Sequence, residues 1–304
     1  MIPKVLCVTS LRSGTHLNQM LLTPKVITVF LDPSPSGKRR AKHAAVLARR
    51  WRAHLMGVHL AFAGIRWPSS MNYVRGDKGI EEVMAYSRRF ETQPETTTQG
   101  VGQHFRTLCA EMNVSSEFHT IGRERSAAES LKMAFLSDLA VVGRPEPNGL
   151  PDNVSVTRLL LESGSPVLIV PNDWSGETIG SKVLVGWNAS LEARRATGDA
   201  MSFIVAAEHV TVLFVDLNDH HPPGNTLRAE LTSYLDWHGV HGDFEHMAPN
   251  CNSIGAALLD YAKRDESDLL VVGAYSHAPA REIIFGGTTR MLLEQTSMPT
   301  FFSR

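Results

Sequence analysis

The segment Asp268-Leu-Leu-Val-Val-Gly273-Ala-Tyr-Ser-His-Ala-Pro-Ala-Arg-Glu-Ile-Ile-Phe-Gly286-Gly287-Thr288-Thr289-Arg290-Met-Leu-Leu293 holds the pattern that decides the fold. Its short apolar run predicts a buried strand that ends at Gly273. After a loop, two glycines and two threonines open an amphipathic helix. Because the first N–H groups of a helix lack partners and lie at its positive end, this arrangement favours a bound phosphate. An ordinary glycine-rich helix entry is the alternative interpretation.

The same pattern occurs earlier in the chain. Asp138-Leu-Ala-Val-Val-Gly143 matches Asp268-Leu-Leu-Val-Val-Gly273, and Thr157-Arg-Leu-Leu-Leu-Glu162 matches Thr289-Arg-Met-Leu-Leu-Glu294. Pro166 and Pro299 follow these matches in the same order. Ordered matches of this kind indicate an internal repeat.

Strand-like and helix-like stretches alternate on both sides of a polar linker that starts near Asn172. Such alternation predicts parallel sheets with helices on both faces and right-handed crossovers. A length of 304 residues fits two domains. We therefore predict an α/β fold of two tandem doubly wound domains, each with a five-stranded parallel sheet. The boundaries are 25–172 for domain 1 and 181–304 for domain 2. Residues 1–24 are predicted to be an N-terminal extension, with Met20 as an alternative start.

Three local predictions follow from the same periodicity. One helix is expected over Leu191 to Ala207, and Asn252 is the expected N-cap of a later helix. The basic clusters Lys38-Arg39-Arg40 and Arg49-Arg50-Trp51-Arg52 are expected to form the solvated face of one helix.

The composition is that of an ordinary globular protein, with 43% hydrophobic and 20% charged residues. A formal net charge of -1 gives no basic field for nucleic acid. The 3 cysteines form no CxxC pair, which is typical of a reduced compartment. No apolar run reaches the roughly 18–20 residues that span a bilayer, and no signal peptide pattern begins the chain. We expect a cytoplasmic protein that has no nucleic acid or membrane partner.

With these motifs, the chain resembles the universal stress protein (UspA) family in its tandem two-domain form. The resemblance covers nearly everything from residue 26 onward. Its most specific motif is the nucleotide loop G-x2-G-x9-G-[S/T] between the fourth strand and the fourth helix. Gly273 and Gly286 take the first and third glycine positions, while Ser276 replaces the second glycine. Gly287 stands where the motif has serine or threonine. The first hydroxyl, that of Thr288, therefore comes one residue after the position where the motif has it.

The resemblance implies that the second half binds ATP or AMP, with Mg. The family's sheet order, 3-2-1-4-5, reverses between strands one and four, and ligands bind at the carboxyl ends of strands at such a reversal. Asn188 stands where the family has an acid, and Val215 is the expected wall of the base pocket. Arg290 is either a contact to the terminal phosphate or a surface arginine. The implied nucleotide-binding set is Asn188, Val215, Gly273, Ser276, Gly286, Gly287, Thr288, Thr289 and Arg290.

The first half keeps the acid, as Asp32, but has lost the phosphate loop. The residues Val154-Ser-Val-Thr157 occupy the places of Gly286-Gly-Thr-Thr289, and a valine there blocks close approach to the backbone. We therefore expect the first half to be a structural partner. The resemblance implies an intramolecular pseudo-dimer, in which the last strands, near Pro166–Val170 and Pro299–Phe302, pair at their edges. It also leaves room for a homodimer.

These observations predict a nucleotide-binding regulatory or stress-resistance protein. The alternative is a ligand-free interaction scaffold of the same fold, which acts through protein contacts. No catalytic set is placed by a motif and the P-loop pattern is absent, so we expect slow ATP hydrolysis at most. His238, His241 and His246 fit no zinc spacing, and no metal site is predicted.

Overall fold

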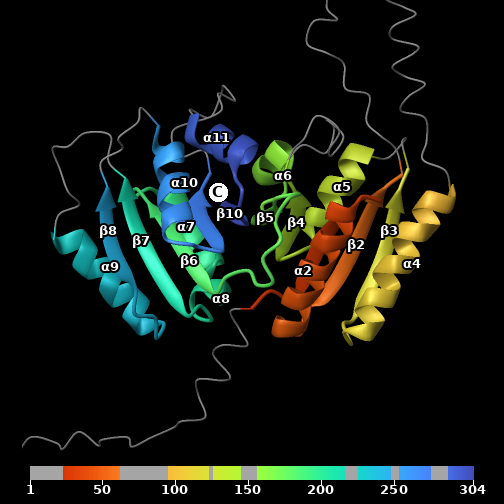
Figure 1. The fold of residues 1–304 in the computed structure, drawn as a ribbon, viewed down its shortest axis with the longest axis horizontal. Helices are drawn as coiled ribbons and strands as arrows, with labels where there is room; N and C mark the ends of the chain where they lie inside the picture. The colour runs from red at the N-terminus through yellow and green to blue at the C-terminus, as the bar shows by residue number, and fades with distance from the viewer. Residues whose placement is uncertain are drawn as a thin grey trace, which may run out of the picture.

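The computed structural model describes residues 23–61, 95–122, 126–144, 156–215, 225–247, 253–274 and 287–304. Figure 1 shows one broad, twisted sheet with helices on both of its faces. The expected N-terminal extension lies almost entirely outside the described residues, as do Ser276, Gly286 and most of the predicted phosphate loop.

In the described part of the chain the strands form a single 10-stranded sheet with the order β3-β2-β1-β4-β5-β10-β9-β6-β7-β8. Each half therefore has the order 3-2-1-4-5, which confirms the sequence prediction. Within each half the strands are parallel, as expected when helices connect them. The strands are β1 (Val26–Leu31), β2 (His54–Leu60), β3 (Ser116–Ile121), β4 (Leu139–Gly143), β5 (Val167–Val170), β6 (Lys182–Trp187), β7 (His209–Val215), β8 (Asp243–Met247), β9 (Leu269–Gly273) and β10 (Thr300–Ser303).

The helices cover the two faces of the sheet and bury a separate hydrophobic cluster on each. One face carries α2 (Pro35–Trp51), α4 (Glu95–Glu111), α7 (Leu191–Asp199), α8 (Met201–Ile204) and α9 (Asn225–Trp237). The other carries α5 (Ser126–Phe135), α6 (Val156–Glu162), α10 (Ile254–Arg264) and α11 (Gly287–Gln295). No helix in the described ranges is long and apolar enough to cross a membrane.

Two predicted helix boundaries are wrong. The helix expected over Leu191 to Ala207 is interrupted at Ala200, between α7 and α8. The Thr197 hydroxyl donates to the carbonyl of Ala193 at 2.9 Å, and such back-bonding, next to a glycine, weakens the last turn of α7. The N-cap of α10 is Ser253 rather than Asn252, because its hydroxyl accepts from the N–H three residues later.

The repeated aspartates have the same structural role in both halves. The Asp138 carboxylate accepts from the N–H groups of Lys25 at 2.7 Å and Val26 at 3.0 Å, at the start of β1. The Asp268 carboxylate accepts from three consecutive N–H groups that lead into β6, including that of Lys182 at 2.8 Å. Hydrogen bonds to a charged acceptor are stronger than neutral ones. Each aspartate therefore fixes where the first strand of its half begins.

The two halves meet through the last strand of each. β5 and β10 pair antiparallel, with Val167 opposite Phe302, so neither strand is left as an open edge. The expected pairing of these strands is confirmed. Beside it, Trp51 packs edge-to-face on Phe203 with ring centroids 4.7 Å apart. The Arg50 guanidinium also donates to the carbonyl of Ala206 at 3.0 Å, which ties α2 to the end of α8.

We expect Phe203→Ala to destabilise the whole chain by about 3–5 kcal/mol, because it leaves a cavity between the two halves. Phe203 is completely buried and contacts a ring from each side of the joint. Urea unfolding, followed by tryptophan fluorescence and circular dichroism, measures the change. Phe135→Ala is the control, because Phe135 is 65% exposed and should change stability by less than about 0.5 kcal/mol. A loss below about 1 kcal/mol in Phe203→Ala would contradict the structural role of this contact.

Candidate functional site

The structure brings three of the predicted site residues of the second half to one edge of the sheet. Asn188 directly follows β6, and Gly273 ends β9, which is the neighbouring parallel strand. Val215 is the last residue of β7, on the other side of β6, and belongs to the same core cluster as Val272. Residues far apart in sequence therefore gather at the carboxyl ends of adjacent strands, where the strand order reverses.

The entry to α11 is open at its first residue. Gly287 is exposed, and a Cβ built on it would meet no atom within 4 Å. Thr288 is half-buried, whereas Thr289 is only 4% exposed, so Thr288 offers the more accessible hydroxyl. A Cβ on Gly255 would lie 3.4 Å from the carbonyl oxygen of Thr288, so the first turns of α10 and α11 lie together (Figure 1). Two positive helix ends therefore lie close to each other.

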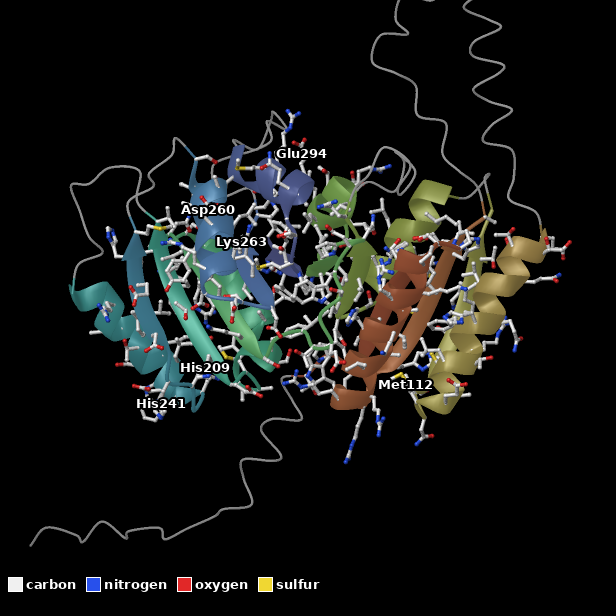
Figure 2. The ribbon with its side chains drawn as sticks, in the orientation of Figure 1. Met112, His209, His241, Asp260, Lys263 and Glu294 are labelled. Carbon is white, nitrogen blue, oxygen red and sulfur yellow. The ribbon has the colours of Figure 1, made fainter. Side chains whose placement is uncertain are left out.

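Arg290 lies on the outer surface of α11 in a salt bridge. Its Nε lies 2.9 Å from the Oε1 of Glu294, which Figure 2 shows near the top of the view. Arg158 makes the same i,i+4 pair with Glu162 on the repeated helix of the first half. Exposed pairs of this kind contribute about 0–1 kcal/mol. The pair matches the surface interpretation of Arg290, yet a phosphate could replace Glu294 at small cost.

Gly273 has a packing role that sequence analysis did not identify. A Cβ at this position would lie 2.5 Å from the backbone nitrogen of Ala193 and 2.8 Å from the Cβ of Glu192. Real Cβ atoms do not approach backbone atoms so closely. Glycine is therefore required here because the end of β9 packs against the first turn of α7.

Asn188 starts α7 in the same way that Asp32 starts α2. The Asn188 Oδ1 accepts from the N–H of Ser190 at 3.2 Å, and the Ser190 hydroxyl caps α7. In the first half the Asp32 Oδ1 accepts from the N–H of Ser34 at 2.9 Å, and Ser34 caps α2. One side-chain oxygen is enough for this turn, so an amide performs the task as well as a carboxylate.

The second oxygen of Asp32 is bound by Arg40. The Arg40 guanidinium pairs with this oxygen, and its Nε donates to the carbonyl of Phe30 at 2.8 Å. A Cβ on Gly143 would lie 2.2 Å from Nη1 of Arg40, so the guanidinium rests directly on the end of β4. Counted from the capping serines, the matching residue of the second half is the small Ala196. The crevice between β1 and β4 is thus filled by the chain's own cation.

The prediction that the basic clusters form a solvated face of α2 is therefore wrong for Arg40, whose side chain is buried with only 4% of the residue exposed. Burial of a charge is costly unless it is paired and hydrogen-bonded, and both conditions are met here. The signal in the sequence was the spacing. An acid follows β1, and an arginine occurs two turns into the next helix, on the same side as its buried alanines.

The environment of Asp32 holds its pKa below the ordinary value. Burial alone would raise the pKa, but the charge of Arg40 and hydrogen bonds from Ser34 and Arg40 outweigh it. Such a carboxylate stabilises the folded state at pH values above the pKa of an unfolded aspartate. That contribution is lost as the pH falls through the lowered pKa.

Two described histidines of the second half have contacts other than a metal. His241 lies 3.0 Å from a carboxylate oxygen of Asp236, and the ring of His238 packs against Tyr234. Figure 2 places His241 at the lower edge of the molecule, at the opposite end of the strands from Asn188. Within the described ranges no group of three or more potential ligands could hold a metal ion.

Comparison with solved structures identifies the fold. No family model matches the chain, and no curated protein is detectably similar to it in sequence. A universal stress protein from Archaeoglobus fulgidus superposes with a TM-score of 0.64, over 92% of this chain and 98% of that one, at 14% identity. The fold is that of the universal stress proteins.

Two other structures show how far the likeness extends. A functionally unknown protein from Pseudomonas aeruginosa covers 94% of both chains with a TM-score of 0.57 and 16% identity. A universal stress protein family protein from Arabidopsis thaliana, solved with AMP bound, covers 40% of this chain and 90% of its own, with a TM-score of 0.29 and 17% identity. At that level the AMP remains a property of the Arabidopsis protein.

We expect Gly273→Ala to destabilise the chain by about 1–3 kcal/mol, because the new methyl group must displace backbone atoms of α7. Gly287→Ala is the matched control within the same predicted motif, since its methyl group enters open space. It should change stability by less than about 0.5 kcal/mol. Thermal melting of both variants measures the difference. Equal melting temperatures would show that β9 does not depend on glycine for its contact with α7.

A second expectation concerns pH. Asp32→Asn should destabilise the chain at pH 7, and the difference from wild type should begin to shrink when the pH falls below the pKa of an unfolded aspartate and go on shrinking through the lowered pKa of Asp32. The reason is that wild-type Asp32 becomes protonated and loses its ion pair, while asparagine can still accept from Ser34. Urea midpoints at several pH values measure this, with exposed Asp173→Asn as the control. A difference that stays constant with pH would contradict the lowered pKa.

Proposed function

We propose that the chain binds an adenine nucleotide, ATP or AMP, in the second half and acts as a regulatory or stress-resistance protein. The observation that supports this proposal most directly is the open first turn of α11. It lies beside the first turn of α10, at the edge of the sheet where the strand order reverses. In this proposal the domains are residues 25–172 and 181–304, and only the second binds a nucleotide.

The phosphates would lie on the backbone N–H groups of Gly286, Gly287 and Thr288. These groups carry partial positive charge, and glycine lets an anion approach the backbone closely. The Thr288 hydroxyl is partly accessible and supplies a further donor. Mg would bind through the phosphates, because Mg is usually held by few protein ligands.

Asn188 suits a site beside phosphates for an electrostatic reason. An amide adds no negative charge next to the anion, and its nitrogen is a donor, whereas an aspartate is only an acceptor. The base would lie towards Val215 at the end of β7, where an apolar side chain forms a wall. At the equivalent place in the first half, the Arg40 guanidinium rests on Gly143 and brings a positive charge of the chain itself.

Calorimetric titration of the full chain with ATP and AMP, with and without Mg, tests the proposal. Gly286→Val, which copies Val154 of the first half, should abolish binding because its side chain blocks the backbone. A nucleotide at 100 times its dissociation constant should also stabilise the wild type by about 2.7 kcal/mol in thermal melting. Unchanged binding in Gly286→Val would refute the site. No binding of either nucleotide at millimolar concentration would favour the ligand-free scaffold.

Arg290→Ala separates the two interpretations of this arginine. If Arg290 contacts the terminal phosphate, the variant should bind ATP about tenfold more weakly, with AMP affinity unchanged. Arg158→Ala is the matched control, because it breaks the same type of ion pair on the repeated helix. Equal ATP affinity in both variants would leave Arg290 as a surface residue.

A further inference from the structure

The first half contains a cavity that the predicted nucleotide site does not use. Its volume is about 240 Å³, and it lies between α2 and α4 above the end of β1. Among the described residues, its buried walls are Leu31, Ala41 and Phe105, with Gly37 and Gly100 beside them. Arg40 is not among its lining residues, so the cavity is separate from the crevice that this arginine fills.

The mouth of this cavity has a net positive charge. Lys38 and His104 line it and are exposed, and the half-buried Asp32 lines it as well. Asp32 does not act as a free anion here, because its two oxygens accept from Ser34 and Arg40. The Asp32–Arg40 pair is neutral as a unit, so among the described lining residues Lys38 supplies the remaining charge at the rim.

The second half has larger side chains at two of the matching positions. Trp187 stands at the position of Leu31 and is buried at 7% exposure. Arg194 stands at the position of Lys38, and its guanidinium carbon lies 4.5 Å from the ring centroid of Tyr234 on α9. There the cation is committed to an aromatic ring of the protein. In the first half, by contrast, the exposed ammonium group of Lys38 lies at the rim of the cavity.

We propose that this cavity of the first half binds a small organic anion with a single apolar ring, such as an aromatic monocarboxylate. The apolar walls suit a ring, and the rim ammonium suits a carboxylate. The volume lies below the roughly 300–1,000 Å³ typical of pockets for drug-sized ligands, which limits the ligand to about one ring. The site is independent of the nucleotide proposed for the second half.

The probe is 4-fluorobenzoate, titrated into the full chain and followed by fluorine NMR. Lys38→Glu should weaken its binding at least about fivefold, as expected when an attractive rim charge becomes repulsive. Arg194→Glu is the matched control at the repeated position and should leave the affinity unchanged. The neutral analogue 4-fluorobenzamide should bind more weakly than the carboxylate, because it lacks the charge that pairs with Lys38.

Gly100→Leu tests the position of the site without relying on charge. A Cβ on Gly100 meets no atom within 4 Å, and leucine favours a helix, so the variant should fold normally. Its side chain would fill the cavity and abolish binding of the probe. Equal affinity in Lys38→Glu and Arg194→Glu, retained binding in Gly100→Leu, or no binding of millimolar 4-fluorobenzoate to wild type would each overturn the proposal. None of these results bears on nucleotide binding.

Discussion

The antiparallel pair of β5 and β10 is the contact on which the arrangement of the whole molecule depends. Each half alone would end its sheet in an exposed strand, which is an unsatisfied row of N–H and C=O groups. By pairing these two edges, the chain turns two five-stranded units into one sheet of 10 strands. The contact of Trp51 with Phe203 then adds a buried aromatic joint beside the sheet.

The two halves differ most at the point where they would be expected to bind a ligand. In the first, Asp32 and Arg40 form a buried pair, and the guanidinium occupies the crevice between β1 and β4. In the second, Asn188 and the small Ala196 stand at the same positions, with neither charge. These substitutions are linked physically, because an acid without its arginine, or an arginine without its acid, would leave an uncompensated charge. In the first half the crevice contains the guanidinium of Arg40, and in the second half no arginine stands at that position.

Much of the candidate site could be predicted because its position follows from topology. Alternation of strands and helices predicted parallel sheets, and the sheet order implied by the family resemblance then placed Asn188 and Gly273 at neighbouring strand ends. The packing role of Gly273 could not be predicted, because it depends on how closely α7 approaches β9 in space. The burial of Arg40 was likewise hidden, since a basic residue on a helix is most often exposed.

The sequence by itself determined the repeated α/β architecture, which follows from periodicity and from repeated residues such as Asp138 and Asp268, whose local hydrogen bonds start β1 and β6. The order of the strands and the pairing of the last strands were implied by the family resemblance that its motifs carry. Only the tertiary structure decided that Arg40 fills the crevice between β1 and β4 and that Gly273 packs directly against α7. It also decided that a cavity stays open between α2 and α4. Each of these depends on distances between elements that are remote in sequence. Side-chain size and helix placement set those distances, and local sequence patterns do not encode them.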